Sequence, residues 1–119
     1  MDPSNPPAVY ESVVEFVENY LSLLYRREVG QGRRVWCPQW WMHAEAVARL
    51  DALWRTWEHY RRDTRTGLSV WFLDHADPHM GILFAPDGPF QFCSTASGHS
   101  GEMPPLPLIA TPPDLFKWP

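Results

Sequence analysis

A single apolar stripe through residues 38–61 constrains the fold more than any other feature of the chain. Its members recur at steps of three and four, which is the spacing of one face of an α-helix. The pattern predicts a helix from Pro38 to Arg61, with Pro38 at its first position and every stripe residue except His43 assigned to the core. The stripe consists of Trp40, His43, Val47, Leu50, Trp54 and Trp57.

The same stretch carries acid–base pairs four residues apart, away from the apolar stripe. In each pair the acid precedes the base, which is the orientation that stabilises a helix. The pairs therefore predict a solvent-facing side, and they account for several arginines without a functional role. They are Glu45–Arg49, Asp51–Arg55 and Glu58–Arg62.

Weaker patterns predict helices before and after this one. Residues 8–27 carry a second apolar stripe, with acids toward its start and bases at its end, as a helix dipole favours. A third helix is expected from about Ser69, and Pro78 should interrupt it before a short fourth helix that ends near Phe84. The expected fold is mainly α, with three to four helices in a small orthogonal bundle.

The last part of the chain has a different composition. Residues 94–119 are rich in serine, glycine and proline, so they predict an extended arm and not a helix. The expected organisation is a lead-in at 1–7, a helical domain at 8–99 and a proline-rich arm at 100–119. We expect Leu115, Phe116 and Trp118 of this arm to pack on the body or on a neighbouring chain.

Two cysteine–histidine pairs are the most specific chemical feature. Cys37 precedes His43 by six positions, and Cys93 precedes His99 by six. These four side chains suit a tetrahedral zinc, and four protein ligands would make the zinc structural. Cys37 would have to approach from the loop before the helix, because it lies on a different helical face from His43. The alternative is a buried histidine bonded to a carbonyl group and two free thiols.

Catalytic alternatives have less support. His75 and His79 are four residues apart beside Asp74, so they could chelate a metal on one helical face, as in a small metal-dependent enzyme. Pro78 lies between them, and the stretch lacks the glutamate base of the His-Glu-x-x-His motif. A cysteine nucleophile would need an orienting residue and an oxyanion site, and neither is visible. We therefore assign no catalytic residue.

Charge and hydropathy restrict the partners. The net charge is −4, although residues 26–65 hold nine arginines against five acids. An acidic chain is unusual for a nucleic-acid-binding domain, so that function is kept only as the second possibility. No apolar run approaches the ~20 residues of a membrane span, and no signal peptide is apparent. These features predict a cytoplasmic protein with no membrane contact.

The expected partner is a protein or a second copy of the chain. Tryptophans that lie off the predicted core stripe are the best candidates for a contact surface, and arginines near them could take part. The expected binding residues are Trp36, Trp41, Arg33, Arg34, Leu115, Phe116 and Trp118.

The segment Trp36-Cys37-Pro38-Gln39-Trp40-Trp41-Met42-His43-Ala44-Glu45-Ala46 resembles an actinobacterial family called domain of unknown function 4913. The resemblance continues through residues 49–58 and includes Asp77-Pro78-His79, Gly88-Pro89-Phe90 and Cys93, so that it covers roughly residues 10–100. It implies a compact domain encoded on plasmids, integrative elements or phages, and it implies no activity. The expected function is therefore a non-enzymatic accessory protein of such an element, with a structural zinc as the candidate cofactor.

Overall fold

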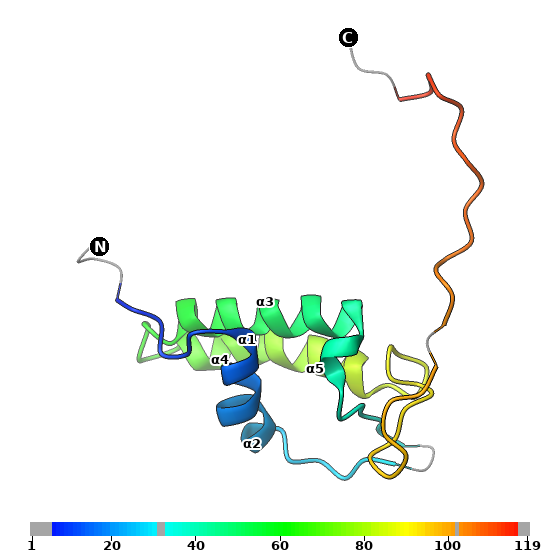
Figure 1. The fold of residues 1–119 in the computed structure, drawn as a ribbon. Helices are drawn as coiled ribbons and strands as arrows, with labels where there is room; N and C mark the ends of the chain where they lie inside the picture. Colours follow the sequence, from blue (N-terminus) through cyan, green and yellow to red (C-terminus); the bar gives the residue numbers. More distant parts are fainter. Residues whose placement is uncertain (1–5, 31–32, 102, 117–119) are drawn as a thin grey trace.

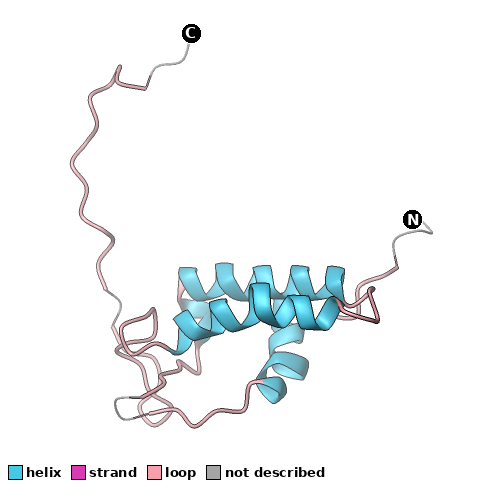
Figure 2. Ribbon diagram, turned by 180° about the vertical axis from the view of Figure 1, so that it is seen from behind, coloured by secondary structure: helices cyan, strands magenta, loops and turns pink. Residues whose placement is uncertain are grey.

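The computed structural model describes residues 6–30, 33–101 and 103–116, and over these ranges the chain forms three helical stretches (Figures 1 and 2). The first stretch comprises α1 (Val13–Phe16), the π-helix η1 (Val17–Leu21) and α2 (Ser22–Leu24). The second comprises the 3₁₀ turn η2 (Trp40–Met42) and α3 (Ala44–Tyr60). The third comprises α4 (Gly67–Trp71), the π-helix η3 (Phe72–Ala76) and α5 (Asp77–Phe84).

The arrangement is a small helical domain. Figures 1 and 2 show α3 and the α4–α5 stretch lying side by side, while α1–α2 projects from them at a steep angle. Within the described residues there is no strand, and Ser94 and Gly98 form an isolated β-bridge. The prediction of a mainly helical fold is confirmed.

A tight turn makes α3 and α4 antiparallel neighbours. The Asp63 carboxylate accepts hydrogen bonds from the backbone N–H of Arg65 and from the Thr66 hydroxyl. The N–H of Gly67 donates to the Asp63 carbonyl, and Gly67 lies against the Tyr60 carbonyl, where a side chain would not fit. The third stretch thus starts at Gly67, two positions before the predicted Ser69.

The core combines all three stretches, and it corrects part of the predicted stripe. Trp40, Leu50 and Trp57 are buried as expected, but Val47 and Trp54 are only half-buried. The buried face of α3 is shifted toward Ala46 and Leu53, because the α4–α5 stretch packs on that side and the indole N–H of Trp71 donates to the Leu53 carbonyl. The fully buried large side chains include Trp71, Phe16, Phe90, Leu21, Leu50, Leu53 and Leu83.

The first helix is shorter than predicted. Ser12 caps it by accepting a hydrogen bond from the N–H of Glu15, so residues 8–11 lie outside the helix. Those residues are instead attached to α3, where the Glu58 carboxylate accepts hydrogen bonds from the N–H groups of Val9 and Tyr10. Glu58 also pairs with Arg61 at 2.8 Å, in place of the predicted Arg62. The pairs Glu45–Arg49 and Asp51–Arg55 are confirmed.

Two further helix boundaries differ from prediction. The second helix begins at Ala44 and not at Pro38, because His43 has an extended backbone that separates η2 from α3. The third stretch continues past Pro78, which was expected to interrupt it. A proline ring collides with the carbonyl of the preceding turn in a regular α-helix. The wider π turn of η3 lies immediately before Asp77 and relieves that collision.

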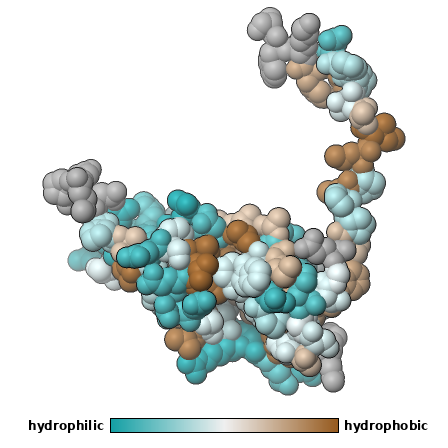
Figure 3. All heavy atoms as spheres, in the orientation of Figure 1, coloured by the Kyte–Doolittle hydropathy of each residue, from teal (hydrophilic) through white to brown (hydrophobic). Residues whose placement is uncertain are grey.

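The proline-rich arm is extended and stands away from the body (Figures 1 and 3). Leu115 and Phe116 are exposed, so the prediction that they pack on the body of their own chain is wrong. The alternative, packing on a neighbouring chain, stays a prediction, and Trp118 lies outside the described residues. In the described part of the chain, no helix combines the length and the apolar character needed to cross a membrane.

Candidate metal centre

The loop between the first and second stretches carries Cys37. This loop is attached to the end of α5 by a hydrogen bond from the N–H of Val35 to the Phe84 carbonyl, 2.9 Å. Trp36 then packs edge-on against Phe90, with ring centroids 5.0 Å apart. These contacts fix the backbone on the N-terminal side of Cys37, whose side chain is fully buried.

His43 is held at the junction of η2 and α3. Its N–H donates to the Trp40 carbonyl, and its carbonyl accepts from the N–H of Val47 in the first turn of α3. Its ring is buried and meets Phe90 edge to face, with centroids 4.9 Å apart. The break in the helix at His43 therefore turns the ring toward the loops and away from the α3 surface.

Two consecutive turns after α5 position the second cysteine–histidine pair, Cys93 and His99. Cys93 closes the first turn, because its N–H donates to the Phe90 carbonyl. Ser94 and Gly98 then exchange hydrogen bonds of 3.1 and 2.7 Å, and Gly98 has a φ of 78°, which favours glycine. This second turn brings His99 back beside Cys93.

One ligand-type atom from each of the four side chains lies within 4.8 Å of the other three. The Nδ1 atom of His99 is 3.5 Å from the Cys37 sulfur, 3.7 Å from the Cys93 sulfur and 3.1 Å from Nε2 of His43. The Cys93 sulfur is 3.5 Å from that same Nε2. Zn–S bonds of ~2.3 Å and Zn–N bonds of ~2.0 Å in a tetrahedron put neighbouring ligand atoms ~3.3–3.8 Å apart. The side chains thus have nearly the spacing that zinc requires.

The electrostatics also suit a divalent cation. Burial, and then the neighbouring Cys93, raises the pKa of the Cys37 thiol to about 11, so the anionic form needs a cation to stabilise it. Two thiolates and two neutral imidazoles around Zn²⁺ have no net charge, which lowers the cost of burying the group. The backbone N–H of Ser100 points at the Cys93 sulfur at 3.5 Å, where it would stabilise a thiolate.

This buried group could bind a metal such as zinc, with two ligands from each of two distant segments. Four protein ligands fill a tetrahedron and leave no position for water or a substrate. The group therefore has the composition of a structural site and lacks the open position of a catalytic one.

The model of the family called domain of unknown function 4913 matches residues 10–112. The chain belongs to this family. All four residues of the metal group lie inside the matched part, and so does most of the extended arm. Neither a curated protein nor a solved structure matches the chain.

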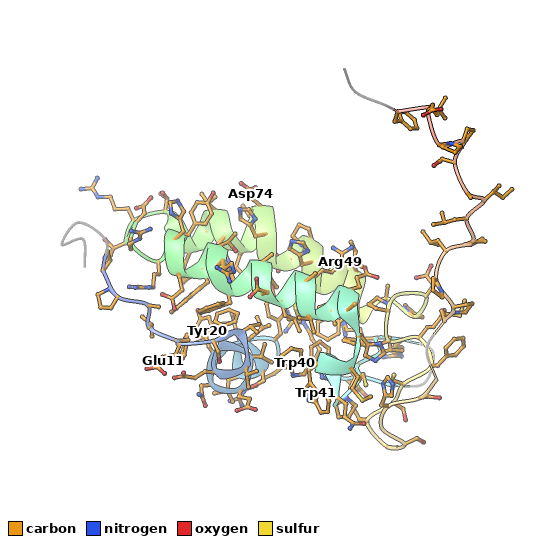
Figure 4. All side chains as sticks on the ribbon, turned by 45° about the horizontal axis from the view of Figure 1, so that its top comes forward. Glu11, Tyr20, Trp40, Trp41, Arg49 and Asp74 are labelled. Carbon is orange, nitrogen blue, oxygen red and sulfur yellow. The ribbon has the colours of Figure 1, made fainter. Side chains whose placement is uncertain are left out.

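In this member of the family, the alternative set of Asp74, His75 and His79 forms no comparable group among the described residues. The Nδ1 atom of His79 lies 3.0 Å from the Arg49 guanidinium. Burial, Arg49 and His75 together lower the pKa of His79. Asp74 is exposed on the α4–α5 stretch (Figure 4), and His75 packs on the Tyr60 ring.

The predicted binding residues are dispersed in this 4913-family chain. Trp41 is 57% exposed, and it borders the same surface groove as the half-buried Trp36. Arg33 and Arg34 are exposed in the loop that precedes Cys37. Leu115 and Phe116 lie on the extended arm, away from these residues (Figure 1).

Sequence reasoning missed two features of these sites. The first is the Ser100 N–H at the Cys93 sulfur, which is a backbone group that no sequence pattern marks. The second is that Trp40, although its side chain is buried, also lines the groove beside Trp41. Residues 40 and 41 are adjacent in sequence, and a 3₁₀ turn was not expected there.

Proposed function

We propose that this chain is a non-enzymatic accessory protein of an actinobacterial mobile element or phage. It acts through protein contacts, and a structural zinc at Cys37, His43, Cys93 and His99 holds its fold. The mobile-element context rests on the resemblance to the family. The observation that carries the proposal is the closed group of four ligand atoms within 4.8 Å of one another.

A zinc at this position would attach the segment after α5 to the start of α3. Residues 85–101 contain no helix and contribute only two side chains, Phe90 and Cys93, to the core. Such a segment buries little apolar surface, so its own packing gives limited stability. A four-ligand metal supplies the missing stability and explains why both cysteines are buried.

The distribution of apolar side chains supports protein contacts. The arm exposes a continuous apolar stretch, and further apolar groups are exposed on the body. Exposed apolar surface of this extent is typical of an interaction site. The most exposed are Leu106, Leu108, Ile109, Phe116, Leu73 and Leu115.

The alternative of nucleic-acid binding has less support. Arg49, Arg55 and Arg61 each pair with an acid of α3, at 2.8–2.9 Å, so part of their positive charge is already offset by neighbouring carboxylates. The net charge of −4 also opposes association with a polyanion. Arg33, Arg34 and Arg65 are exposed but do not form a helix face or a stripe.

The proposal is tested on the purified full chain by metal analysis and cobalt replacement. We expect one zinc per chain, and we expect Co²⁺ to give the intense visible absorption of a tetrahedral site with thiolate ligands. Adding small anionic ligands such as azide should leave the spectrum unchanged, because four protein ligands occupy the metal. His59→Ala, which alters an exposed histidine away from the group, is the matched control and should retain full metal content.

Two outcomes would contradict the proposal. A cobalt spectrum that changes with azide would reveal an open coordination position and favour a metal-dependent enzyme. A complex with DNA or RNA that weakens steeply with added salt would favour the nucleic-acid function.

A further inference from the structure

An apolar groove lies between the first helical stretch and η2, outside the metal centre. It has a volume of about 590 Å³ and is open to solvent. Its apolar walls come from three tryptophans, a proline and two valines. These residues are Val14, Val17, Trp36, Pro38, Trp40 and Trp41.

The residues at the base of the groove are buried, whereas those at its rim are exposed. Val17 belongs to η1 and is buried in the core, and Trp40 is nearly as buried, so both form a fixed base. Trp41 is 57% exposed and Val14 is 46% exposed, so their surfaces lack a partner in the single chain. Figure 4 places Trp40 and Trp41 beside each other below the first turn of α3. The groove is therefore preformed, with exposed tryptophan surface at its rim.

A groove lined by tryptophans is the usual receptor for a proline-rich segment in the polyproline II conformation. Proline rings stack on indole faces, and the segment is already extended, so little conformational entropy is lost on binding. A polyproline II backbone has no internal hydrogen bonds, so its carbonyls can accept from indole N–H groups.

The arm of this chain has the matching chemistry. Residues 103–113 contain no charged side chain and include Pro104, Pro105 and Pro107. The apolar residues that follow these prolines, Leu108 and Ile109, are 90% and 94% exposed. The arm and the groove are thus two unpartnered surfaces of complementary type on one molecule. The groove has one acidic neighbour, Glu18, which an uncharged segment tolerates.

We propose that the arm of one copy docks in the Trp41 groove of a second copy, and that the exchange is reciprocal. The direction of the arm favours a second copy over its own groove. The arm leaves the body next to the metal centre, where Gly101 and Met103 border a hollow beside His43. Figure 4 shows the arm pointing away from Trp40 and Trp41. Pro104 and Pro105 follow at once and stiffen the chain, so a reversal toward its own groove is costly.

Reciprocal exchange gives a closed two-fold dimer in which the same contact forms twice. Each contact is small, so we expect a weak, concentration-dependent dimer in the micromolar range, as for interfaces of limited area. This inference rests on the proposed function, because it treats the arm as a protein-binding surface. It adds that the partner is a second copy of the chain and that the binding site is the Trp41 groove.

The test compares variants of the full chain by sedimentation velocity over a concentration series. Trp41→Ala removes the exposed groove wall, and an arm variant replaces Leu106, Leu108 and Ile109 with serine. Each should raise the dissociation constant of the dimer by at least about tenfold. Leu73→Ala is the matched control, because it removes an exposed apolar side chain that borders neither groove nor arm, and it should leave the constant unchanged.

Mixing the two defective variants gives the decisive measurement. The Trp41→Ala chain retains an intact arm, and the arm variant retains an intact groove, so an equimolar mixture should form a heterodimer through one contact. Labelling one of the two variants with a fluorophore makes that heterodimer visible in sedimentation. Neither variant alone should associate at the same concentration.

A wild-type chain that stays monomeric at every concentration would overturn the inference, whether the arm is free or folds onto its own groove. A dimer that Trp41→Ala leaves unchanged would also overturn it. Metal content and the cobalt spectrum are recorded for the same samples. A monomer with a zinc-loaded, closed site would refute arm exchange alone, whereas a dimer without zinc would refute only the structural-zinc part of the proposed function.

Discussion

At the scale of single residues, Trp71 joins the two long helical stretches through one polar atom. Its side chain is fully buried, and its indole N–H donates to the Leu53 carbonyl and to the Thr56 hydroxyl, both at 3.1 Å. The same hydroxyl donates to the Ala52 carbonyl, so the buried polar groups are satisfied together. The rings of Phe16 and Phe72 pack around the indole.

Trp71→Ala should therefore lower the free energy of unfolding by about 3–5 kcal/mol, because it creates a large cavity and leaves the Thr56 hydroxyl with one partner fewer. Trp41→Ala is the control and should change the free energy by less than about 0.5 kcal/mol at dilute concentration. Urea denaturation followed by circular dichroism measures both. Similar losses for the two variants would show that the core has been assigned wrongly.

Cys37→Ala should abolish stoichiometric zinc binding, since the three remaining ligands do not complete the tetrahedron. The loss of a structural metal should lower the free energy of unfolding by about 4 kcal/mol or more. A zinc assay and thermal denaturation, with and without a chelator, check both effects. If chelator lowers the melting temperature of wild type and variant equally, Cys37 is not a ligand.

At the scale of elements, two glycines of the third stretch have opposite roles. A Cβ at Gly67 would lie 1.9 Å from the Tyr60 carbonyl oxygen, so this glycine permits the close approach of α4 to the end of α3. A Cβ at Gly81 in α5 would meet nothing within 4 Å. Gly81 therefore lowers helix stability without a packing reason.

Gly67→Ala should destabilise the domain by more than about 3 kcal/mol, because the backbone must shift at the turn. Gly81→Ala should stabilise it by about 0.5–1 kcal/mol through the higher helix propensity of alanine. Chemical denaturation should show a lower free energy of unfolding for Gly67→Ala and a higher one for Gly81→Ala. A neutral Gly67→Ala would contradict the close contact with Tyr60.

Glu58 attaches the N-terminal segment to α3, and this attachment depends on pH. Burial alone would raise the pKa of its carboxyl group, but hydrogen bonds from the Tyr10 and Val9 N–H groups and from Arg61 lower the pKa overall. Because the pKa of Glu58 is lower in the folded protein than in the unfolded chain, its ionised carboxylate stabilises the fold. This stabilisation is fully present at pH values above the unfolded-state pKa, and it is lost as the pH falls through the folded-state pKa.

Glu58→Gln should cost about 1–2 kcal/mol at neutral pH, since the neutral amide lacks the charge that accepts three hydrogen bonds. The cost should shrink toward zero at a pH below the folded-state pKa, where the wild-type carboxyl is protonated too. Any change in metal content with pH affects both proteins alike, so their difference reports on residue 58. Glu28→Gln, at an exposed site, should show no difference at either pH.

The element boundaries show where sequence reasoning succeeds. The apolar spacing located all three helical stretches, since burial of a periodic face decides where helices form. It misplaced the starts, because these depend on local backbone geometry. The extended backbone at His43 and the π turn before Pro78 have no simple sequence signature. The shift from Trp54 to Leu53 as the buried residue depends on how the neighbouring helix packs.

For the metal group too, the sequence identified the residues but not the backbone geometry that brings them together. Residue type and equal spacing singled out Cys37, His43, Cys93 and His99, and the structure places them within 4.8 Å of one another. The spacing could not indicate that His43 lies at a helix break or that the turn at Gly98 returns His99 to Cys93. Those details depend on backbone conformations far apart in the chain. Metal occupancy stays a prediction.

At the scale of the whole molecule, the chain divides into a packed body and an arm that adds nothing to its core. Leu106, Leu108 and Ile109 are at least 84% exposed, so they contribute little to the packing of the body. At low concentration, replacing Leu106, Leu108 and Ile109 with serine should leave the melting temperature unchanged within about 1 °C. Limited proteolysis should cut the arm first and leave a larger fragment that retains the helices α1 to α5. A lower melting temperature for the monomeric variant would contradict this division.

The metal group joins Cys37 and His99 across 62 positions of sequence, whereas the helical elements contact one another mainly within one stretch or between adjacent stretches. Contacts between distant positions carry the largest loop-closure entropy and tend to form late in folding. An interaction absent from the folding transition state changes mainly the unfolding rate. The ion would therefore set the lifetime of the native state and have little influence on how quickly a newly made chain reaches it.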